Sequence, residues 1–394
     1  MSAIRSRLPL SGVRVVDFTQ VVAGPYCTMM LADMGAEIIK IERPGHGDDL
    51  RRTMPYAGRE GHQDYFNALN RSKKSVALDL KQAKHRAAAL QLIERADVVV
   101  ENFSPGTVDK LGVGWEASSK LNPRLIYCSL SGFGQTGPYR ERLALDPIIQ
   151  AVSGMMSVTG FPDGPPTMVG APLADVIAGM FAAYCIVNAL RLVTADGGGQ
   201  YIDLSMQDAL LASVGTRMGE TLQAGIAPPR LGNENPLRVP ANTYRTADDG
   251  VIAVMVHDQG QWQPFCEAVD KPEWIRDSRF ETMALRLQHR SKMDELVAQA
   301  IGLKDSGYWA ARFAEYRIPC APVNDYAQAL QDPQVAHRGL LHEVEHPVSG
   351  KIRVVGPPWR MSSTQPQIGS PPLLGEHTAE VLDNWLGLKL EELK

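Results

Sequence analysis

The sequence of 394 residues is poor in cysteine and carries little excess charge. Its five cysteines are odd in number and form no C-x-x-C pair, which argues against a disulfide framework or a zinc site and fits a reducing compartment. The net charge of −4 argues against broad attraction to nucleic acid. The opening residues, MSAIRSRLPLSG, contain no apolar signal region, and the apolar run 176–190 is too short to span a bilayer. We therefore expect a cytoplasmic protein that associates with neither nucleic acid nor a membrane.

The signatures of several large enzyme classes are missing as well. The first strand–helix turn reads DFTQVVAGP and contains no G-x-G-x-x-G, so a dinucleotide site is not indicated. The chain also has no Walker motif, no H-E-x-x-H and no G-x-S-x-G. Its nine histidines show no metal-ligand spacing, and we expect no metal site.

The pattern that is present is an alternation of strands and helices. Residues 12–42 have the hydrophobic spacing of a strand, a turn, a helix and a second strand, which is a βαβ unit. Further strands are expected at 74–80, 97–103, 124–134 and 200–206, with a helix at 83–96. The sequence therefore predicts an α/β fold, with a large Rossmann-like domain built on a parallel sheet.

The composition changes beyond residue 210. Residues 211–240 are rich in loop-forming residues and are expected to link the large domain, 1–210, to a smaller one. A hairpin is indicated around Asp248-Asp249-Gly250, and helical segments follow it. We therefore expect residues 241–325 to form a small α+β domain and residues 326–394 to form a separate C-terminal segment.

Polar and glycine-rich loops follow the predicted strands. In an open parallel sheet such loops meet at one edge, where ligands bind. The basic residues in or near these loops form either an ordinary solvated surface or a site for a multiply phosphorylated ligand; they are Arg43, Arg71, Lys73, Lys74, Lys81 and Lys110. Asn102 and Phe103 could hold a purine ring, or Phe103 could simply complete the core of its strand.

One acidic residue, Asp175, opens the longest apolar segment, in the sequence PLADVIAG. No charge follows until Arg191, which predicts a buried helix that begins near Asp175. Asp175 is then either the N-cap, which accepts backbone N–H groups of the first turn, or a carboxylate that faces a cleft as a nucleophile or acid–base group. The residues alone leave both interpretations open.

Seven blocks of sequence, in order over nearly the whole chain, resemble the class III CoA-transferases, a family that includes formyl-CoA:oxalate and carnitine CoA-transferases. The blocks are LSGVRVVDFTQVVAGPYCTMMLADMGAEIIKIERPGHGDDLR, NRSKKSVALDLK, ADVVVENFSPGTVDKLG, NPRLIYCSLSGFGQTGPY, DGPPTMVGAPLADVIAGM, IPCAPV and PPLLGEHT. The resemblance implies that each chain forms a ring, that two rings interlock into a homodimer, and that the C-terminal segment returns to the large domain.

The resemblance also implies roles for individual residues. Asp175 falls on the family's nucleophile, which would attack an acyl-CoA and form an aspartyl-CoA thioester by way of a mixed anhydride. Backbone N–H groups at the helix start would stabilise the oxyanions, and a loop would close over Asp175. Coenzyme A would be a co-substrate, with no cofactor tightly bound, and its contacts would fall on Val22, Ala23, Arg43, Leu78, Lys81, Asn102, Phe103 and Lys110.

Two departures from the family pattern bear on the substrate. The formyl-CoA enzymes carry a long, glycine-dense loop near the position of RLGNENPLRVPAN, which is short here. This favours succinyl-CoA as donor and a short carboxylate as acceptor over formyl-CoA and oxalate. The related acyl-CoA racemases carry a His-Asp pair where this chain reads Ala144-Leu145-Asp146. The missing histidine counts against a racemase or isomerase, which is the second alternative. The third is a CoA-binding protein without catalysis, in which Asp175 is only a cap.

Overall fold

The computed structural model describes residues 8–53 and 63–393, and the chain divides into two compact units. The first unit consists of Met1–Met155, Met168–Ala227 and His337–Lys394; the second consists of Met156–Thr167 and Pro228–Ala336. These limits differ from the boundaries at 210, 240 and 325 that we expected. The cause is pairing between segments distant in sequence: Gly232 N donates to Gly160 O (2.9 Å), and Arg230 Nη2 donates to Gly164 O (2.8 Å).

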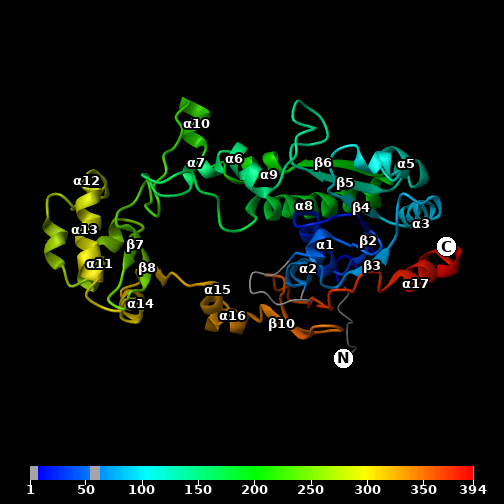
Figure 1. Ribbon diagram of the computed structural model, residues 1–394. Coiled ribbons are helices and arrows are strands. Elements are labelled where there is room, and N and C mark those ends of the chain that lie inside the picture. The colour runs from blue at the N-terminus through cyan, green and yellow to red at the C-terminus, as the bar shows by residue number, and fades with distance from the viewer. Residues whose placement is uncertain (1–7, 54–62, 394) are drawn as a thin grey trace. The chain divides into compact units, whose positions relative to one another are not determined.

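The first unit is built on a six-stranded sheet in which every pair of neighbours is parallel, as predicted (Figure 1). The strand order is β3-β2-β1-β4-β5-β6. The chain therefore moves outward from β1 to β3, returns to the other side of β1 with β4, and continues to β6. The strands are β1 Arg14–Asp17, β2 Glu37–Glu42, β3 Lys74–Ala77, β4 Val98–Glu101, β5 Ile126–Ser131 and β6 Gln200–Ser205.

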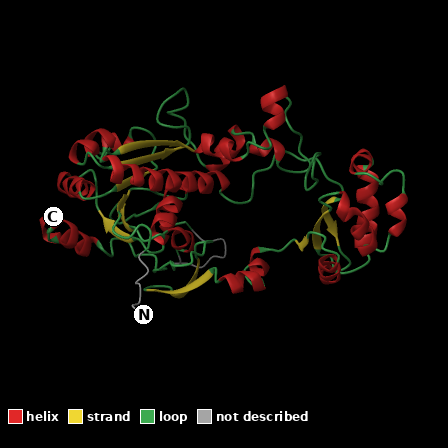
Figure 2. Cartoon of the chain, turned by 180° about the vertical axis from the view of Figure 1, so that it is seen from behind, coloured by secondary structure: helices red, strands yellow, loops and turns green. Residues whose placement is uncertain are grey.

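Helices cover both faces of this sheet (Figure 2). Because side chains alternate along a strand, Val15 faces one layer of helices and Val16 faces the other. The first layer contains α1 Ala23–Asp33, α6 Asp146–Val152, α8 Leu173–Asp196 and α9 Met206–Ser213; the second contains α3 Ala83–Glu94, α4 Thr107–Lys110 and α5 Trp115–Leu121. The shorter helices of the first unit are α2 Asp64–Leu69, α7 Met155–Val158, which crosses the unit boundary, and α10 Gly219–Ala224.

The C-terminal segment packs on the first unit. It contains the antiparallel hairpin β10 Leu341–His346 and β11 Gly350–Val355, then α17 Thr378–Val381, a π-helical turn at Leu382–Leu386 and a short 3-10 helix at Leu390–Leu393. His377 N donates to Ser75 O (3.0 Å), and Ala77 N donates to Thr378 Oγ1 (3.0 Å), so the segment joins the outer side of β3. Val381, Leu382 and Trp385 then enter the core under α3.

The second unit contains a three-stranded antiparallel sheet in the order β7-β8-β9. The hairpin predicted around Asp248 is the β7–β8 turn. Aromatic side chains fill its core, and Phe265 stacks on Trp262 at 6.0 Å and on Phe313 at 5.9 Å. Its elements are β7 Ala241–Arg245, β8 Val251–Met255, β9 Cys320–Pro322, α11 Trp262–Ala268, α12 Met283–Gln288, α13 Arg290–Ile301, α14 Ser306–Glu315, α15 Tyr326–Ala329 and α16 Pro333–Arg338, which crosses the unit boundary.

Helix α8 is longer than the apolar run that we took from the sequence. By length and composition alone, Leu173–Val193 would be able to cross a membrane, although we had judged the run too short. The structure explains the apolar composition differently, because Ala178, Ala182 and Ile186 are buried in the core beside α1. The opposite side of α8 exposes large apolar side chains, including Met180 and Tyr184.

Candidate active site

The site is assembled where the strand order reverses, between β1 and β4. In open α/β sheets this is the position where a crevice forms beyond the carboxyl ends of the strands. The chain leaves β1 through Gln20, and it leaves β4 through Asn102. The Asn102 amide accepts from Gln20 N and donates to Gln20 O, both at 2.8 Å. Asn102 therefore joins the two loops, and its amide is not free to read a base edge as the sequence suggested.

Two of the predicted CoA-contacting residues, Val22 and Ala23, lie at the start of α1. Gly24 allows this start to approach the neighbouring loops closely, since a Cβ there would lie 2.4 Å from Thr19 Cβ. Gly179 performs the same role on α8, where a Cβ would lie 2.6 Å from Ala23 O. Residues four apart share one face of a helix, so Asp175 lies on the face of α8 that meets Ala23. The structure thus brings Asp175 and the first turn of α1 together.

The basic residues near the crevice separate into two groups. All three of Arg43, Lys81 and Lys110 are exposed: Arg43 directly follows β2, Lys81 lies in the turn between β3 and α3, and Lys110 is the last residue of α4. Within the described part of the chain their side chains make no hydrogen bond or ion pair. The other three are neutralised inside the first unit: Arg71 binds Asp33, Lys73 binds Asp17, and Lys74 binds Glu37 and Glu380. Only the first group, which coincides with the predicted CoA contacts, can supply charge to an anionic ligand.

The two remaining predicted contacts are apolar. Leu78 is buried in the core beneath α3, and its N–H donates to Glu42 O at 2.9 Å. Phe103 is half-buried and packs on the edge of the same core, while its N–H donates to Glu101 Oε2 at 2.9 Å. Both residues follow strands whose ends border the crevice. Phe103 is therefore partly a core residue, and it keeps an accessible part beside the crevice.

Asp175 is the third residue of α8, not its N-cap, which is Pro172. The capping carboxylate comes from elsewhere: Asp146, the first residue of α6, accepts from Ala174 N (2.7 Å) and Asp175 N (3.3 Å). These two N–H groups are consequently already bonded, which corrects the expectation that they would serve as free oxyanion donors. Among the described residues, no group hydrogen-bonds the Asp175 carboxylate itself.

A second side chain, Gln150, extends this arrangement. Gln150 is fully buried, and its Nε2 donates to Asp146 Oδ2 at 2.7 Å. Its Oε1 accepts from Val169 N at 2.9 Å, in the segment that leads to Asp175. Sequence reasoning missed both Asp146 and Gln150 as parts of the site. Their spacing of four residues, one turn of α6, is the signal that could have pointed to a shared role, but no helix was predicted there.

The environment of Asp175 favours its neutral form. Burial and the repulsion of the Asp146 carboxylate raise the pKa of Asp175 from 3.8 to about 7. A carboxylate without a hydrogen-bonding partner at the start of a helix is weakly solvated, which makes its ionised form more reactive. The site can therefore present a nucleophilic carboxylate near neutral pH. No group of three His, Cys, Asp or Glu side chains suited to a metal occurs in the described ranges.

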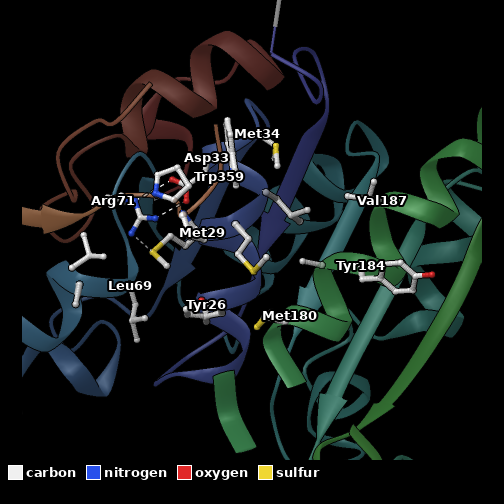
Figure 3. Close-up of a pocket in the computed structure, with 18 of the residues that line it drawn as sticks. Tyr26, Met29, Asp33, Met34, Leu69, Arg71, Met180, Tyr184, Val187 and Trp359 are labelled. Atoms are coloured by element: carbon white, nitrogen blue, oxygen red, sulfur yellow. Dashed lines mark hydrogen bonds and ion pairs between the residues drawn. The ribbon is translucent and has the colours of Figure 1, made fainter. Parts of the chain in front are cut away.

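A cavity of about 540 Å³ that is open to solvent on one side lies elsewhere in the first unit, between α1, α8 and residues 355–359 (Figure 3). Its walls are mostly apolar, with Met29, Met180 and Tyr184 among them. The Arg71–Asp33 pair is its charged element, and Arg71 Nη1 also contacts Met29 Sδ at 2.7 Å. An apolar chamber with a neutralised pair does not suit the phosphates of coenzyme A, so this cavity is separate from the crevice.

The fold and the site together define a class of protein: a Rossmann-like α/β protein with cations, unpaired within the described ranges, in the loops and the short helix that follow the strands, and with a carboxylate in the first turn of α8. Comparison with known proteins identifies the family. The model described as CoA-transferase family III matches residues 10–378, and the chain belongs to this family. It is an enzyme of the class III CoA-transferases.

Individual relatives agree with this assignment. The succinyl-CoA:glutarate CoA-transferase of Homo sapiens is 36% identical over 380 residues, which cover 95% of this chain and 85% of that protein. The formyl-CoA:oxalate CoA-transferase of Rhodopseudomonas palustris is 34% identical, with coverage of 96% and 93%. A solved CaiB/BaiF family protein from Brucella suis superposes with a TM-score of 0.88 at 32% identity and covers 96% of this chain and 100% of that chain.

Proposed function

We propose that this enzyme transfers coenzyme A between carboxylic acids through a covalent intermediate on Asp175. The observation that carries the proposal is the Asp175 carboxylate, which stands half-buried and without a hydrogen-bonding partner among the described residues, next to the first turn of α1. Asp146 satisfies the helix start, so Asp175 is not needed as a cap.

The chemistry follows from a carboxylate nucleophile and a thioester. Ionised Asp175 attacks the acyl carbonyl of the donor, which forms a mixed anhydride and releases CoA thiolate. The thiolate attacks the Asp175 carbonyl, which forms an aspartyl-CoA thioester and frees the donor acid. The acceptor carboxylate then attacks this thioester, and the released thiolate attacks the new anhydride at the acceptor carbonyl. Asp175 is regenerated, and no net proton or electron is consumed.

Coenzyme A binds at the crevice in this proposal. Arg43, Lys81 and Lys110 face its phosphates, since these three cations have no ion-pair partner in the described ranges. Val22 and Ala23 approach the thioester end from the first turn of α1, and Leu78, Asn102 and Phe103 border the nucleotide end. Coenzyme A is a co-substrate in this scheme, and the other substrates are small carboxylates.

A racemase that uses two bases is the second candidate function for this chain. It would require a proton acceptor opposite Asp175, in the Ala144-Leu145-Asp146 stretch. Leu145 is an exposed aliphatic side chain, and the Asp146 carboxylate is occupied by two backbone N–H groups and Gln150. Neither is suited to exchange a proton with a substrate carbon, which favours the transferase.

Succinyl-CoA is the donor that we propose, with a short carboxylate as acceptor. The human relative uses succinyl-CoA and glutarate, while the Rhodopseudomonas relative uses formyl-CoA and oxalate. Segment 230–242 contains few glycines, unlike the corresponding loop of the formyl-CoA enzymes, and this favours succinyl-CoA with a short carboxylate. Incubation with succinyl-, acetyl- or formyl-CoA and a panel of carboxylates, followed by chromatography of the CoA thioesters, ranks the donors. Turnover with formyl-CoA and oxalate alone would reverse this choice.

Trapping tests the covalent step directly. The protein is incubated with succinyl-CoA and treated with hydroxylamine or borohydride, and its peptides are mapped by mass. Hydroxylamine should convert Asp175 to a hydroxamate and borohydride should reduce it, in both cases only when acyl-CoA is present. Asp175→Asn should abolish the label, and Asp163→Asn, at an exposed carboxylate of the second unit, should not. Absence of label on Asp175 with every donor refutes the mechanism.

We also propose that the chain works as an interlocked homodimer of ring-shaped subunits. The support is the exposed apolar side of α8, where Tyr184 is 65% and Met180 is 48% exposed beside the apolar cavity of Figure 3. Apolar surface of this kind is typical of a permanent interface. Light scattering should give twice the chain mass, and Tyr184→Glu should shift it toward the monomer. A monomeric wild-type chain would contradict the proposal.

The proposed compartment is the cytoplasm. All five cysteines are free thiols, and Cys27, Cys128 and Cys266 are buried, as expected where thiols stay reduced. Fractionation of cells that express the tagged chain tests this, and recovery from a secreted or membrane fraction would contradict it.

A further inference from the structure

The β1–α1 loop, Thr19–Val22, is held by a buried ion pair that reaches it from β2 and from the turn after β2. Lys40 Nζ donates to Thr19 O at 2.6 Å, and Val21 N donates to Asp48 Oδ1 at 3.2 Å. Lys40 Nζ and Asp48 Oδ2 are paired at 2.9 Å, and both side chains are fully buried. The pair therefore fixes the loop on both sides of Gln20.

The backbone conformation between these two contacts is unfavourable by itself. Val21 has φ +66°, in the left-handed region, and it is the one β-branched residue with positive φ in the described ranges. Such a conformation is a steric outlier for valine and persists only where the surroundings over-determine it. The Lys40–Asp48 pair supplies two of the contacts that hold it.

This conformation is transmitted to the residues that meet the ligand. Gly24 packs on Thr19 so closely that a Cβ would lie 2.4 Å from Thr19 Cβ. Val22 and Ala23 lie between these two fixed points and start α1. A change in the path of Thr19 or Val21 therefore displaces the first turn of α1, which faces Asp175.

We propose that Lys40 and Asp48 are positioning residues for coenzyme A, because they hold the β1–α1 loop in the one conformation that presents Val22 and Ala23 to the ligand. The inference rests on the proposed function. It assigns a binding role to two buried residues that no ligand can touch. A loop that occupies this conformation only part of the time would bind CoA more weakly in proportion to the lost fraction.

Lys40 keeps its positive charge at neutral pH. Burial opposes charge on Lys40, but the Asp48 and Asp17 carboxylates prevail and raise the pKa of Lys40 above its ordinary value. A charged donor makes a stronger hydrogen bond to Thr19 O than a neutral one would. Replacement of both partners by neutral residues of similar size removes this bond without leaving a buried charge unpaired.

The test compares CoA binding by wild type and Lys40→Met/Asp48→Asn with isothermal titration calorimetry. In the double variant the new asparagine retains an oxygen for Val21 N, but Thr19 O loses its donor. We expect the Kd for CoA to rise about tenfold, which corresponds to about 1.4 kcal/mol. In turnover, KM for acyl-CoA should rise while kcat changes much less, since Asp175 is untouched. Asp48→Asn alone should give a smaller rise in the same direction, and it serves if the double variant does not fold.

A control separates positioning from loss of stability. Ile301→Ala opens a cavity in the core of the second unit, which contains none of the proposed CoA contacts, and should lower the melting temperature without changing the Kd for CoA. If the folded double variant binds CoA as tightly as wild type, or if Ile301→Ala weakens binding equally, the positioning role is refuted. If wild type itself does not bind CoA, the proposed function fails, and the inference fails with it.

Discussion

Asp146→Asn is the substitution that best tests how the site activates Asp175. Asp146 and Asp175 approach each other at the start of α8, where Asp146 Oδ1 lies 3.3 Å from Asp175 N. The asparagine keeps an oxygen for the N–H groups of Ala174 and Asp175 and removes the negative charge. The helix start should therefore stay capped while the repulsion disappears.

The size of the pKa change expected in Asp146→Asn follows from the two causes that raise the pKa of Asp175. Burial is the larger and the Asp146 carboxylate the smaller cause of the change from 3.8 to about 7. Two carboxylates at this range in a partly solvated site repel by about 1.4 kcal/mol, which equals about one pKa unit. The pKa of Asp175 should therefore fall from about 7 by about one unit in the variant, toward but not to its ordinary value.

The pH dependence of kcat/KM for acyl-CoA measures this shift. Only ionised Asp175 attacks the thioester, so activity should rise with pH through about 7 in the wild type. The rising limb should move about one unit lower in Asp146→Asn. Asp146→Ala, which also removes the cap, should lose stability by about 1 kcal/mol in addition. A rising limb in Asp146→Asn that coincides with that of the wild type would refute the electrostatic reasoning.

Three further substitutions probe the site. Asp175→Asn should abolish transfer and also raise the free energy of unfolding by roughly 1–3 kcal/mol at pH 8. A carboxyl whose pKa is raised on folding destabilises the fold once the pH exceeds 3.8, and it does so most above about 7. Equal denaturant midpoints for the wild type and the variant at pH 8 would contradict this. Gly24→Ala should weaken CoA binding in calorimetry because its Cβ would collide with Thr19; unchanged affinity would show that α1 can shift freely. Lys110→Met should raise KM for acyl-CoA roughly three- to tenfold at low salt and less at high salt. Lys120→Met should leave KM unchanged, because Lys120 lies near the end of α5, just before the amino end of β5.

The βαβ pattern was sufficient to predict the parallel sheet, because buried strands such as β4 have a continuous apolar centre, Val98-Val99-Val100, bounded by polar residues. The strands proved shorter than predicted. Asn102 leaves β4 to bond Gln20 in the loop after β1, and Phe103 N donates to the Glu101 side chain instead of to a neighbouring strand. Of the six basic residues grouped from the sequence, Arg71, Lys73 and Lys74 form ion pairs within the first unit. Periodicity places Lys73 near the strand ends, but it does not reveal that Asp17 lies opposite it at 3.2 Å. Such pairing depends on strand order, which a single sequence does not specify.

The cap at the start of α8 shows the same limit and explains the site. From the sequence, the cap and the nucleophile were alternative roles for Asp175, because no other carboxylate lies close enough in the sequence to cap this helix. In the structure a residue 29 positions earlier takes the cap. Asp146 thereby orients the helix start, raises the pKa of Asp175 together with burial, and leaves the Asp175 carboxylate without a hydrogen-bonding partner in the described ranges. Because Asp146 caps the helix, the backbone of Asp175 is held in place while its carboxylate oxygen atoms remain available to act as the nucleophile.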